Sequence, residues 1–458
     1  MVETAPQTAT ITQELAEYVA SLDARSLPSD VVEQTKWAVL DLLGVTVAGA
    51  DLPFARTVRE YYGELGGKAE ATAVGVNGRL PAINAALVNG VCGHTLDMDD
   101  GHRYAGGHPG VVAIPAALAA GELAGASGAD LVAATVAGYE VFIRVASLMN
   151  PAHLRRGFHT TGTVGPLAAA AAAGRVLGLD AKQLTHALGI ASVQFGGLIL
   201  VLHDGAPLKP LHPGKAASAG VLAAVLAQRG AEGPVAALEG DDGFVKVLSG
   251  LDDTSGLTDG LGERQVMREI YFKLHAACRH THPALDVALD LAREHALTPA
   301  QIERVHLATY SVAYRFTGTV YEPDTVSAAK FSLPFSLALA FGRGSAGVNA
   351  FVPENLGDPE LLRLARKVTI EVDPELDARY PGVRGAVLTV TTTDGRTLQA
   401  STELARGEPE VPATPEDLES KFSHNVSPWL GPTRAVELRD AVRRLESVSV
   451  TDLARLLV

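Results

Sequence analysis

The chain has 458 residues, 47% of them hydrophobic and 20% charged, which predicts a globular protein with two or more domains. Its net charge of −14 argues against a nucleic-acid partner and against binding to an anionic membrane. The two cysteines, Cys92 and Cys278, form no Cys-x-x-Cys pair, so a disulfide framework and a thiolate metal site are excluded.

No stretch predicts a membrane span or a secretory signal. The longest apolar run without a charge or a histidine, residues 187–202, falls short of the roughly 20 apolar residues that a spanning helix needs. Residues 1–11 lack a basic region followed by an apolar core. We therefore expect a cytoplasmic protein that does not bind a membrane.

The first half of the chain consists of helix-length blocks that are rich in Ala, Leu, Val and Gly. Ser29 and Asp30 precede the first long block and supply candidate N-caps. The predicted helices cover residues 31–49, 81–96, 110–124, 129–148, 163–177, 181–190 and 215–228. Because the alternation typical of strands is almost absent, residues 1–268 are predicted to form the first part of a large all-helical domain.

The pattern changes near residue 265. Polar and apolar side chains alternate, as in half-buried strands, at residues 302–310, 367–372, 386–392 and 398–404, and Asp394-Gly395 predicts a hairpin turn. With helices at 283–295 and 327–341, residues 269–404 are expected to form a smaller α+β domain. Helices at 433–445 and 451–458 then return residues 405–458 to the helical domain. The predicted fold is mainly α, with the α+β domain inserted into the large helical one.

Five polar clusters interrupt these apolar blocks, and the first lies at residues 94–110 between two predicted helices. It contains three histidines and three aspartates: His94, Asp97, Asp99, Asp100, His102 and His108. A cluster of this kind binds a metal, transfers protons or faces solvent as an ordinary loop. The residue types alone leave these three roles open.

The second and third clusters each precede a predicted helix. Residues 155–166 contain His159 and Thr161 in front of an Ala-rich helix, whose N-terminal N–H groups attract anions. The same residues are also typical of an ordinary N-cap. Lys209 lies among prolines and apolar residues, where a partly buried lysine needs an anionic partner unless the loop is exposed.

The fourth cluster, residues 271–283, lies at the predicted domain boundary, where ligand pockets often form. It combines Lys273, Cys278 and Arg279 with three histidines, His280 among them, and is the densest cationic group of an acidic chain. The fifth spans residues 310–321 and is followed by Lys330. Together the clusters favour a site for a small polyanionic molecule held by Lys and His.

Six motifs, in this order, resemble the MmgE/PrpD family. They are His-Thr-Leu-Asp-Met-Asp-Asp, Gly-His-Pro-Gly, Gly-Phe-His-Thr-Thr-Gly, Lys-Pro-Leu-His-Pro-Gly, Phe-Lys…Cys-Arg-His-Thr-His-Pro and Ala-Lys-Phe-Ser-Leu-Pro-Phe. The family includes 2-methylcitrate dehydratases, cis-aconitate decarboxylases and iminodisuccinate epimerases. The resemblance covers essentially the whole chain. It implies a homodimer whose protomers have a large helical domain and a smaller lid domain, with the site for a small polycarboxylate between them and neither a metal nor an organic cofactor.

The resemblance also implies site residues. Those expected to be catalytic are Asp97, His108, His159, Lys209 and Lys273, and those expected to bind the substrate are His102, Thr161, Cys278, His280 and Tyr314. Cys278 stands where the decarboxylases carry a His, and Gly101 stands where they carry a Thr. These departures argue against cis-aconitate decarboxylase activity.

The chemistry follows from charge. Removal of a proton or of CO2 beside a carboxylate leaves a carbanion, and Lys209, Lys273 and protonated histidines would stabilise it. Dehydration also needs a base for the α-proton and an acid for the departing hydroxyl, and histidines fill both roles near neutral pH. Asp97 is expected to orient His108 or His159, as the carboxylate of a triad does.

We therefore predict a cofactor-free lyase that dehydrates a 2-hydroxy polycarboxylate such as 2-methylcitrate. The first alternative is decarboxylation or epimerisation of a related polycarboxylate, such as cis-aconitate or iminodisuccinate. A more remote one is a metal-dependent hydrolase that uses His94, Asp97, Asp99, Asp100 and His108, although their spacing fits no standard helix-borne ligand pair. A non-catalytic scaffold would not need buried cations.

Overall fold

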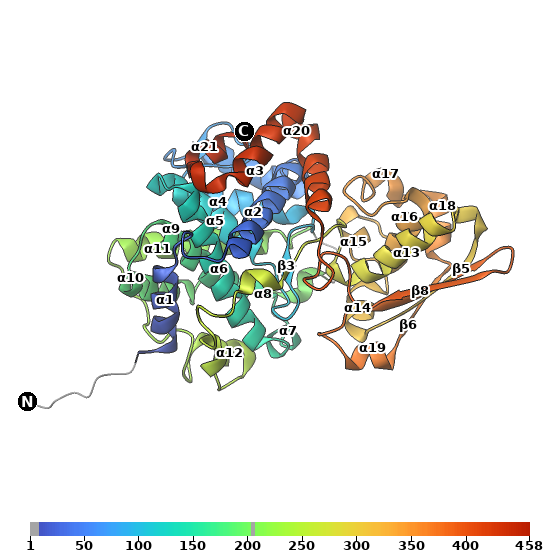
Figure 1. Ribbon diagram of the computed structural model, residues 1–458, viewed down its shortest axis with the longest axis horizontal. Coiled ribbons are helices and arrows are strands. Elements are labelled where there is room, and N and C mark those ends of the chain that lie inside the picture. Colours follow the sequence, from blue (N-terminus) through green and yellow to red (C-terminus); the bar gives the residue numbers. More distant parts are fainter. Residues whose placement is uncertain (1–8, 203–206) are drawn as a thin grey trace, which may run out of the picture.

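The computed structural model describes residues 9–202 and 207–458, and the prediction of a mainly α protein is confirmed. Figure 1 shows a large helical body on one side and a smaller lobe, which contains a sheet and helices, on the other. The body is built from both ends of the sequence, since the blue N-terminal helices and the red C-terminal helices lie together in it (Figure 1).

The first part of the chain gives the body most of its helices. They are α1 (Ile11–Ser21), α2 (Ser29–Gly49), α3 (Pro53–Leu65), α4 (Ala82–Thr95), α5 (Gly110–Ala124), α6 (Gly128–Met149), α7 (Ala152–Arg155), α8 (Thr160–Thr163), α9 (Gly165–Val176), α10 (Ala181–Ala191), α11 (Leu211–Gln228) and α12 (Phe244–Ser249). The strands β1 (Ala71–Thr72) and β2 (Arg79–Leu80) form a short antiparallel pair. The Ala-rich blocks of the sequence thus predicted most of these helices to within a few residues.

The centre of the body is formed by α5, α6 and α9, which are buried over most of their length. The helix α9 packs against α5, α6 and α11, and α4 packs against α11 and α2. Among the described helices, α6 is long and apolar enough to cross a membrane, and the bent pair α2–α3 would add a second span. In the body, 89% of the most apolar 18-residue stretch of α6 is buried.

Glycines let α4 and α11 approach until their backbones touch. A Cβ atom on Gly90 would lie 2.9 Å from the Cα of Gly214, and one on Gly214 would lie 2.6 Å from the carbonyl oxygen of Leu87. Because neither glycine has a side chain, the second half of α4 can lie directly against the first turns of α11. This packing brings Asp97, which follows α4, close to Lys209, which precedes α11.

The smaller lobe, called the α/β lobe below, contains a four-stranded sheet with the order β6-β5-β7-β8. Its strands are β5 (Ile302–Thr309), β6 (Val368–Val372), β7 (Ala386–Thr392) and β8 (Thr397–Thr402). The strands β5 and β6 are parallel, whereas β7 is antiparallel to both β5 and β8. The predicted hairpin is present, with Gly395 at a φ of +86° in its turn. The helices of the lobe are α13 (His282–Glu294), α14 (Ser311–Thr317), α15 (Val326–Ala329), α16 (Leu333–Arg343), α17 (Pro353–Leu356), α18 (Pro359–Ala365) and α19 (Pro374–Ala378).

The chain leaves the body and re-enters it at one narrow connection, which we call the neck. There, β3 (Gly101–His102) pairs with β4 (Ile270–Tyr271), and the N–H of Phe272 donates to the carbonyl oxygen of Gly407 at 3.0 Å. Beyond the neck, α20 (Pro415–Arg443) packs against α2, and α21 (Val450–Arg455) packs against α5. Both contacts lie within the helical body.

Two predicted helices differ from those observed. The helix expected at 327–341 is interrupted at Lys330, Phe331 and Ser332, because the Ser332 hydroxyl accepts the N–H of Phe335 and starts α16 anew. The helix expected at 433–445 is the second half of the longer α20, which is kinked at Gly431 with a φ of +77°.

Candidate active site

A cavity of about 380 Å³ lies between the helical body and the α/β lobe. The body lines it with Asp97, His108, Arg155, His159 and Lys209, among others. The lining residues that follow the neck include Lys273, Cys278, Arg279, His280, Arg315, Tyr380 and Arg384. Of the described residues that line the cavity, six are Lys or Arg and two are acidic. Its wall is therefore cationic, although the protein as a whole is acidic.

Asp97 holds two lysines at the body end of the cavity. Its Oδ1 lies 2.7 Å from the Nζ of Lys209 and 2.9 Å from the Nζ of Lys273. Burial raises the pKa of Asp97, but Lys209 and Lys273 outweigh it and bring this pKa well below its usual value. The carboxylate is therefore ionised, and it gathers two ammonium groups that have N–H donors left for a substrate.

Three lysines from distant parts of the chain bind successive carbonyl groups at the end of α4. The Nζ of Lys330 donates to the carbonyl oxygens of Thr95 and Leu96, at 3.2 and 2.9 Å. Lys273 donates to that of Asp97 at 2.8 Å, and Lys421 donates to that of Met98 at 2.7 Å. The last carbonyls of a helix lack partners and carry partial negative charge, which cations stabilise. The lysines thus fix the segment 95–98 that carries Asp97.

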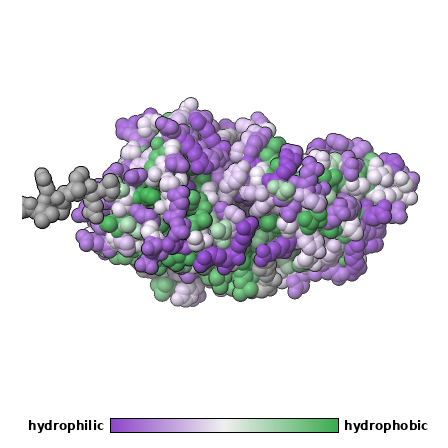
Figure 2. Space-filling view, turned by 90° about the horizontal axis from the view of Figure 1, so that it is seen from below, coloured by the Kyte–Doolittle hydropathy of each residue, from purple (hydrophilic) through white to green (hydrophobic). Residues whose placement is uncertain are grey.

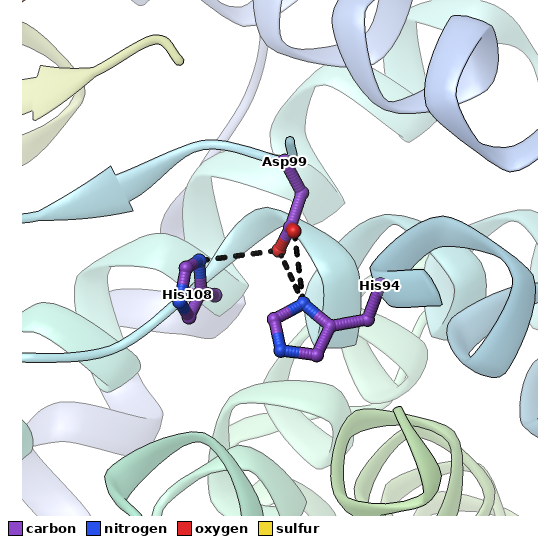
Figure 3. Close-up of side chains that lie close together, drawn as sticks. All are labelled: His94, Asp99 and His108. Carbon is purple, nitrogen blue, oxygen red and sulfur yellow. Dashed lines mark hydrogen bonds and ion pairs between the residues drawn. The ribbon is translucent and has the colours of Figure 1, made fainter. Parts of the chain in front are cut away.

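His94, Asp99 and His108 form a buried cluster beside this segment (Figure 3). The Nδ1 of His94 lies 2.8 Å from Oδ1 of Asp99, and the Nδ1 of His108 lies 3.2 Å from Oδ2 of the same carboxylate. Burial raises the pKa of Asp99, but the two histidines hold it well below its usual value. Burial lowers the pKa of His94 to about 3, so that its ring is neutral.

The cluster fixes which nitrogen of His108 can react. Its Nδ1 lies 2.7 Å from the carbonyl oxygen of Asp100, which can only accept a hydrogen bond, so Nδ1 carries the proton. In the neutral ring, Nε2 is then the nitrogen that can accept a proton from a ligand. The carboxylate that orients His108 is therefore Asp99 and not Asp97, in contrast to the expectation from sequence, because Asp97 is occupied by the lysines.

His159 lies at the start of α8 and is paired with another histidine. Its Nδ1 lies 2.8 Å from the Nδ1 of His212, on the first turn of α11. Burial, together with Lys209 and His212, lowers the pKa of His159 well below its usual value. Burial and Lys209 likewise lower the pKa of His212 to about 4. His159 therefore faces the cavity as a neutral imidazole.

The α/β lobe closes the other end of the cavity. Cys278 lines it, and burial raises the pKa of its thiol, which is therefore neutral. The Nδ1 of His280 lies 2.6 Å from the hydroxyl of the buried Tyr310. Burial, followed by Arg384 and Lys273, lowers the pKa of His280 well below its usual value.

Three of the residues expected to contact the substrate do not line the cavity. His102 is buried against Glu269, at 3.2 Å from its Oε2, and the Thr161 hydroxyl accepts the backbone N–H of His108 at 3.2 Å. Tyr314 is 40% exposed. The residues of α14 that line the cavity are Ser311, Val312, Arg315 and Phe316, which leaves Tyr314 on another side of this helix. The other seven residues expected in the site line the cavity together.

The candidate metal ligands are brought together only in part. Nitrogen and oxygen atoms of His94, Asp99 and His108 lie within 4.8 Å of one another, as in a metal site. Asp97 instead binds lysines, and Asp100 accepts hydrogen bonds from the hydroxyl of Tyr139 and the N–H of Gly110. The Nδ1 of His108 donates its proton to the carbonyl oxygen of Asp100 and is not free to bind a metal, so the cluster fits a hydrogen-bonded network better than a metal centre.

The clusters found in the sequence leave out several residues of the cavity wall, including Asp377, Tyr380 and Arg384. Asp377 and Tyr380 lie at the end of α19, and Arg384 lies in the turn before β7. These positions carry no motif and no apolar periodicity. Their role depends on the return of the lobe toward the body, which local sequence does not indicate.

The chain is similar to known proteins along most of its length. The MmgE/PrpD N-terminal domain family matches residues 13–256, and the MmgE/PrpD C-terminal domain family matches residues 275–447. The chain is 30% identical to the cis-aconitate decarboxylase of Homo sapiens over 96% of its length and 92% of that protein. It is 29% identical to the cis-aconitate decarboxylase of Mus musculus, over 96% of this chain and 91% of that protein.

A relative from a fungus is similar over nearly the whole of this chain. The cis-aconitate decarboxylase of Aspergillus terreus is 26% identical over 98% of this chain and 95% of that protein. The two family matches together span both the helical body and the α/β lobe. The chain belongs to the MmgE/PrpD family.

Proposed function

We propose that this protein is a cofactor-independent lyase that acts on a small polycarboxylate in the cavity between the body and the lobe. The observation that carries this proposal is the pairing of Lys209 and Lys273 on Asp97 in a cavity that His108 and His159 also line. The ammonium groups bind the carboxylate next to the reacting carbon. They stabilise the negative charge that moves onto its oxygens, and electrostatic stabilisation of this kind usually contributes most to such catalysis.

Dehydration of a 2-hydroxy polycarboxylate such as 2-methylcitrate is the reaction that we propose first. A neutral His159 is suited to remove the α-proton, because burial and Lys209 keep its ring unprotonated. His108, which Asp99 and the Asp100 carbonyl hold in one orientation, acts as the acid in its protonated form and donates its Nε2 proton to the departing hydroxyl. The electron pair of the C–H bond forms the double bond, the electron pair of the C–O bond leaves with the oxygen, and the proton from His108 completes the water molecule.

Decarboxylation of cis-aconitate is the second candidate, because the relatives described above bear that name. In this reaction the C–C bond to the departing carboxylate breaks, and the resulting carbanion takes a proton from a protein acid. Lys209, Lys273, His108 and the neutral thiol of Cys278 all line the cavity, and one of them is the acid in this reaction.

A substrate panel decides between these reactions. The purified protein is incubated with 2-methylcitrate, citrate, cis-aconitate and iminodisuccinate, and the products are followed by mass spectrometry. Loss of 18 mass units indicates dehydration, and loss of 44 indicates decarboxylation. Epimerisation of iminodisuccinate is followed by circular dichroism. Absence of turnover with all four compounds would contradict the proposed substrate class.

Variants of the lysines assign any turnover to this cavity. Lys273→Met and Lys209→Met should each lower kcat/KM by roughly 10²–10³, because each removes a charged donor whose side chain is largely shielded from solvent. A parallel reaction after exhaustive chelation should proceed at the rate of the untreated enzyme. Loss of activity on chelation, followed by recovery with a divalent ion, would favour the metal-dependent alternative.

We also propose that the protein acts as a homodimer. Exposed apolar side chains occur among the described residues 193–202 and 207–208, close in sequence to two residues of the cavity wall, Ile199 and Leu202. They are Val193, Phe195, Leu198, Leu200 and Leu208. Apolar side chains also form separate groups on the underside of the helical body (Figure 2). Sedimentation velocity of the wild type and of Leu200→Glu tests whether this segment is covered by a second copy.

A further inference from the structure

Arg384 is a buried guanidinium group on the wall of the cavity. Its residue is only 5% exposed, yet it is one of the residues that line the cavity. Its Nη2 donates to the carbonyl oxygen of Arg103, and its guanidinium lies 5.7 Å from the centre of the Tyr380 ring. Its Nε is buried and has no hydrogen-bond partner among the described residues. The group is therefore fixed in place but has donor capacity left.

The neighbouring arginines differ from Arg384 in one respect. Arg279 has its Nη2 2.9 Å from a carboxylate oxygen of Glu408, and Arg103 is paired with Glu410. Within residues 9–202 and 207–458, no carboxylate lies within ion-pair distance of Arg384. Burying a charge without a partner is costly, and proteins almost always avoid it. A ligand with negative charge would supply the missing partner.

We propose that Arg384 binds a second carboxylate of the substrate, at the lobe end of the cavity. The first carboxylate is held at the body end by Lys209 and Lys273, which are already gathered on Asp97. His280 and Tyr380 line the wall beside Arg384 and complete this subsite. The inference rests on the proposed function for the class of ligand, and it adds which residue of the α/β lobe binds a second carboxylate of that ligand.

A substrate that binds at both ends of the cavity also contacts both parts of the chain. Because Lys209 lies on the body and Arg384 on the α/β lobe, a bound polycarboxylate connects the two parts of the chain across the cavity. A monocarboxylate satisfies the lysines alone and leaves Arg384 buried without a partner. The protein should therefore discriminate by the number of carboxylates that the ligand carries.

Binding of two unreactive acids tests the proposal. Tricarballylate (propane-1,2,3-tricarboxylate) has no hydroxyl group to eliminate, and butyrate has a single carboxylate. Their dissociation constants are measured by calorimetry and by ligand-observed NMR, respectively. Arg384→Met should weaken tricarballylate binding by about 10- to 100-fold, the range expected for loss of one charged hydrogen-bonded contact. Butyrate binding should stay within about twofold.

The control is Arg293→Met, which removes the same charge from an exposed residue of the α/β lobe that does not line the cavity. Its effect on tricarballylate should stay below about threefold, because solvent screens an exposed charge. Far-UV circular dichroism and melting temperatures check that both variants fold, and Arg384→Lys should recover part of the lost affinity.

Three other outcomes would each contradict a specific part of the proposal. If Arg384→Met binds tricarballylate within threefold of the wild type, or loses no more affinity than Arg293→Met, the subsite is wrong. If both ligands lose affinity equally, Arg384 does not bind a separate carboxylate. If the wild type fails to bind tricarballylate at millimolar concentration, the substrate class of the proposed function is wrong, and the subsite is rejected with it.

Discussion

Asp97 has a left-handed backbone conformation, with a φ of +52°, which Asp adopts more readily than most other residues. Its side chain holds Lys209 and Lys273, and its carbonyl oxygen accepts a hydrogen bond from Lys273 as well. The strained backbone thus turns both acceptors of one residue toward the same ammonium group. A residue in this conformation at a site indicates a geometric requirement that the surrounding contacts maintain.

His159→Gln should separate binding from proton transfer. Glutamine roughly preserves the size and the hydrogen bonding of His159, but it cannot exchange a proton. We expect turnover to fall by about 10²–10⁴, the usual contribution of general acid–base catalysis, with little loss of substrate binding. Matched measurements of kcat and of the substrate dissociation constant check this. If binding is lost while bound substrate reacts normally, His159 is a carboxylate anchor and the proton carrier is His108.

The buried His153 predicts how the stability of the folded protein depends on pH. It is buried, its Nε2 lies 2.9 Å from the Thr163 hydroxyl, and burial lowers its pKa to about 4. The unfolded chain binds this proton near pH 6.5, whereas the folded chain binds it only near pH 4. Acid therefore favours the unfolded state between these two values, and stability rises with pH across the same window.

The His153→Gln variant lacks this proton and should be less sensitive to acid. Between pH 7 and pH 5, the wild type should lose about 2 kcal/mol more unfolding free energy than the variant. Urea denaturation at the two pH values measures the difference. Equal losses in the two proteins would show that His153 is protonated in the folded state as readily as in the unfolded one.

At the residue scale, the sequence predicted best those side chains that follow a helix end. Asp97, His159 and Lys209 stand at the start or end of apolar blocks, and they line the cavity as polar residues that the core excludes. Arg384 is preceded by no such block. Tyr314 is expected in the site from its spacing to Phe331, and spacing along the chain does not tell which side of α14 faces the cavity.

At the scale of elements, the carbonyl groups at the end of α4 and just beyond it accept hydrogen bonds from lysine side chains. Lys421 comes from α20, and its Nζ lies 2.7 Å from the carbonyl oxygen of Met98 and 2.5 Å from Oδ1 of the buried Asp41. Lys330 comes from the break between α15 and α16, and burial lowers its pKa to about 8. The helix break that sequence periodicity did not predict thus places a lysine on the site segment.

Lys421→Met should destabilise the protein by about 3–5 kcal/mol, because it leaves the carboxylate of Asp41 buried without a partner. The double variant Lys421→Met, Asp41→Asn removes that charge and should recover much of the stability. Turnover should remain low in both, since the carbonyl group of Met98 has lost its donor in both. Urea denaturation and kcat/KM measure the two effects. Recovery of turnover in the double variant would show that Lys421 acts through stability alone.

At the scale of the whole molecule, the neck sets how the α/β lobe meets the body. Gly407 has a φ of +91°, and a Cβ atom there would lie 2.1 Å from the carbonyl oxygen of Phe272. Lys273 follows Phe272 directly, so a displaced neck would move a lysine of the site. The prediction of a mainly α protein did not require this detail, because composition and periodicity report elements and not the angle between two parts of a chain.

Gly407→Ala should therefore lower kcat/KM by at least about tenfold, since misplacement of catalytic groups by about 1 Å can cost about 100-fold. Gly395→Ala is the matched control. Gly395 also has a positive φ, but nothing lies within 4 Å of its added Cβ and it is located in the β7–β8 turn. The control should cost about 1 kcal/mol of stability and leave turnover unchanged. Equal turnover in both variants would contradict a role for the neck.

The packing of α20 on α2 also has a consequence for biosynthesis. The ribosome makes α2 (Ser29–Gly49) early and α20 (Pro415–Arg443) late, so at about 5–20 residues per second α2 waits on the order of tens of seconds for its neighbour. During that time its apolar face needs another cover, and the segment 95–98 lacks Lys421. A nascent chain that stalls inside the lobe would therefore be both catalytically inert and prone to aggregation, which makes it a substrate for chaperones rather than a partial enzyme.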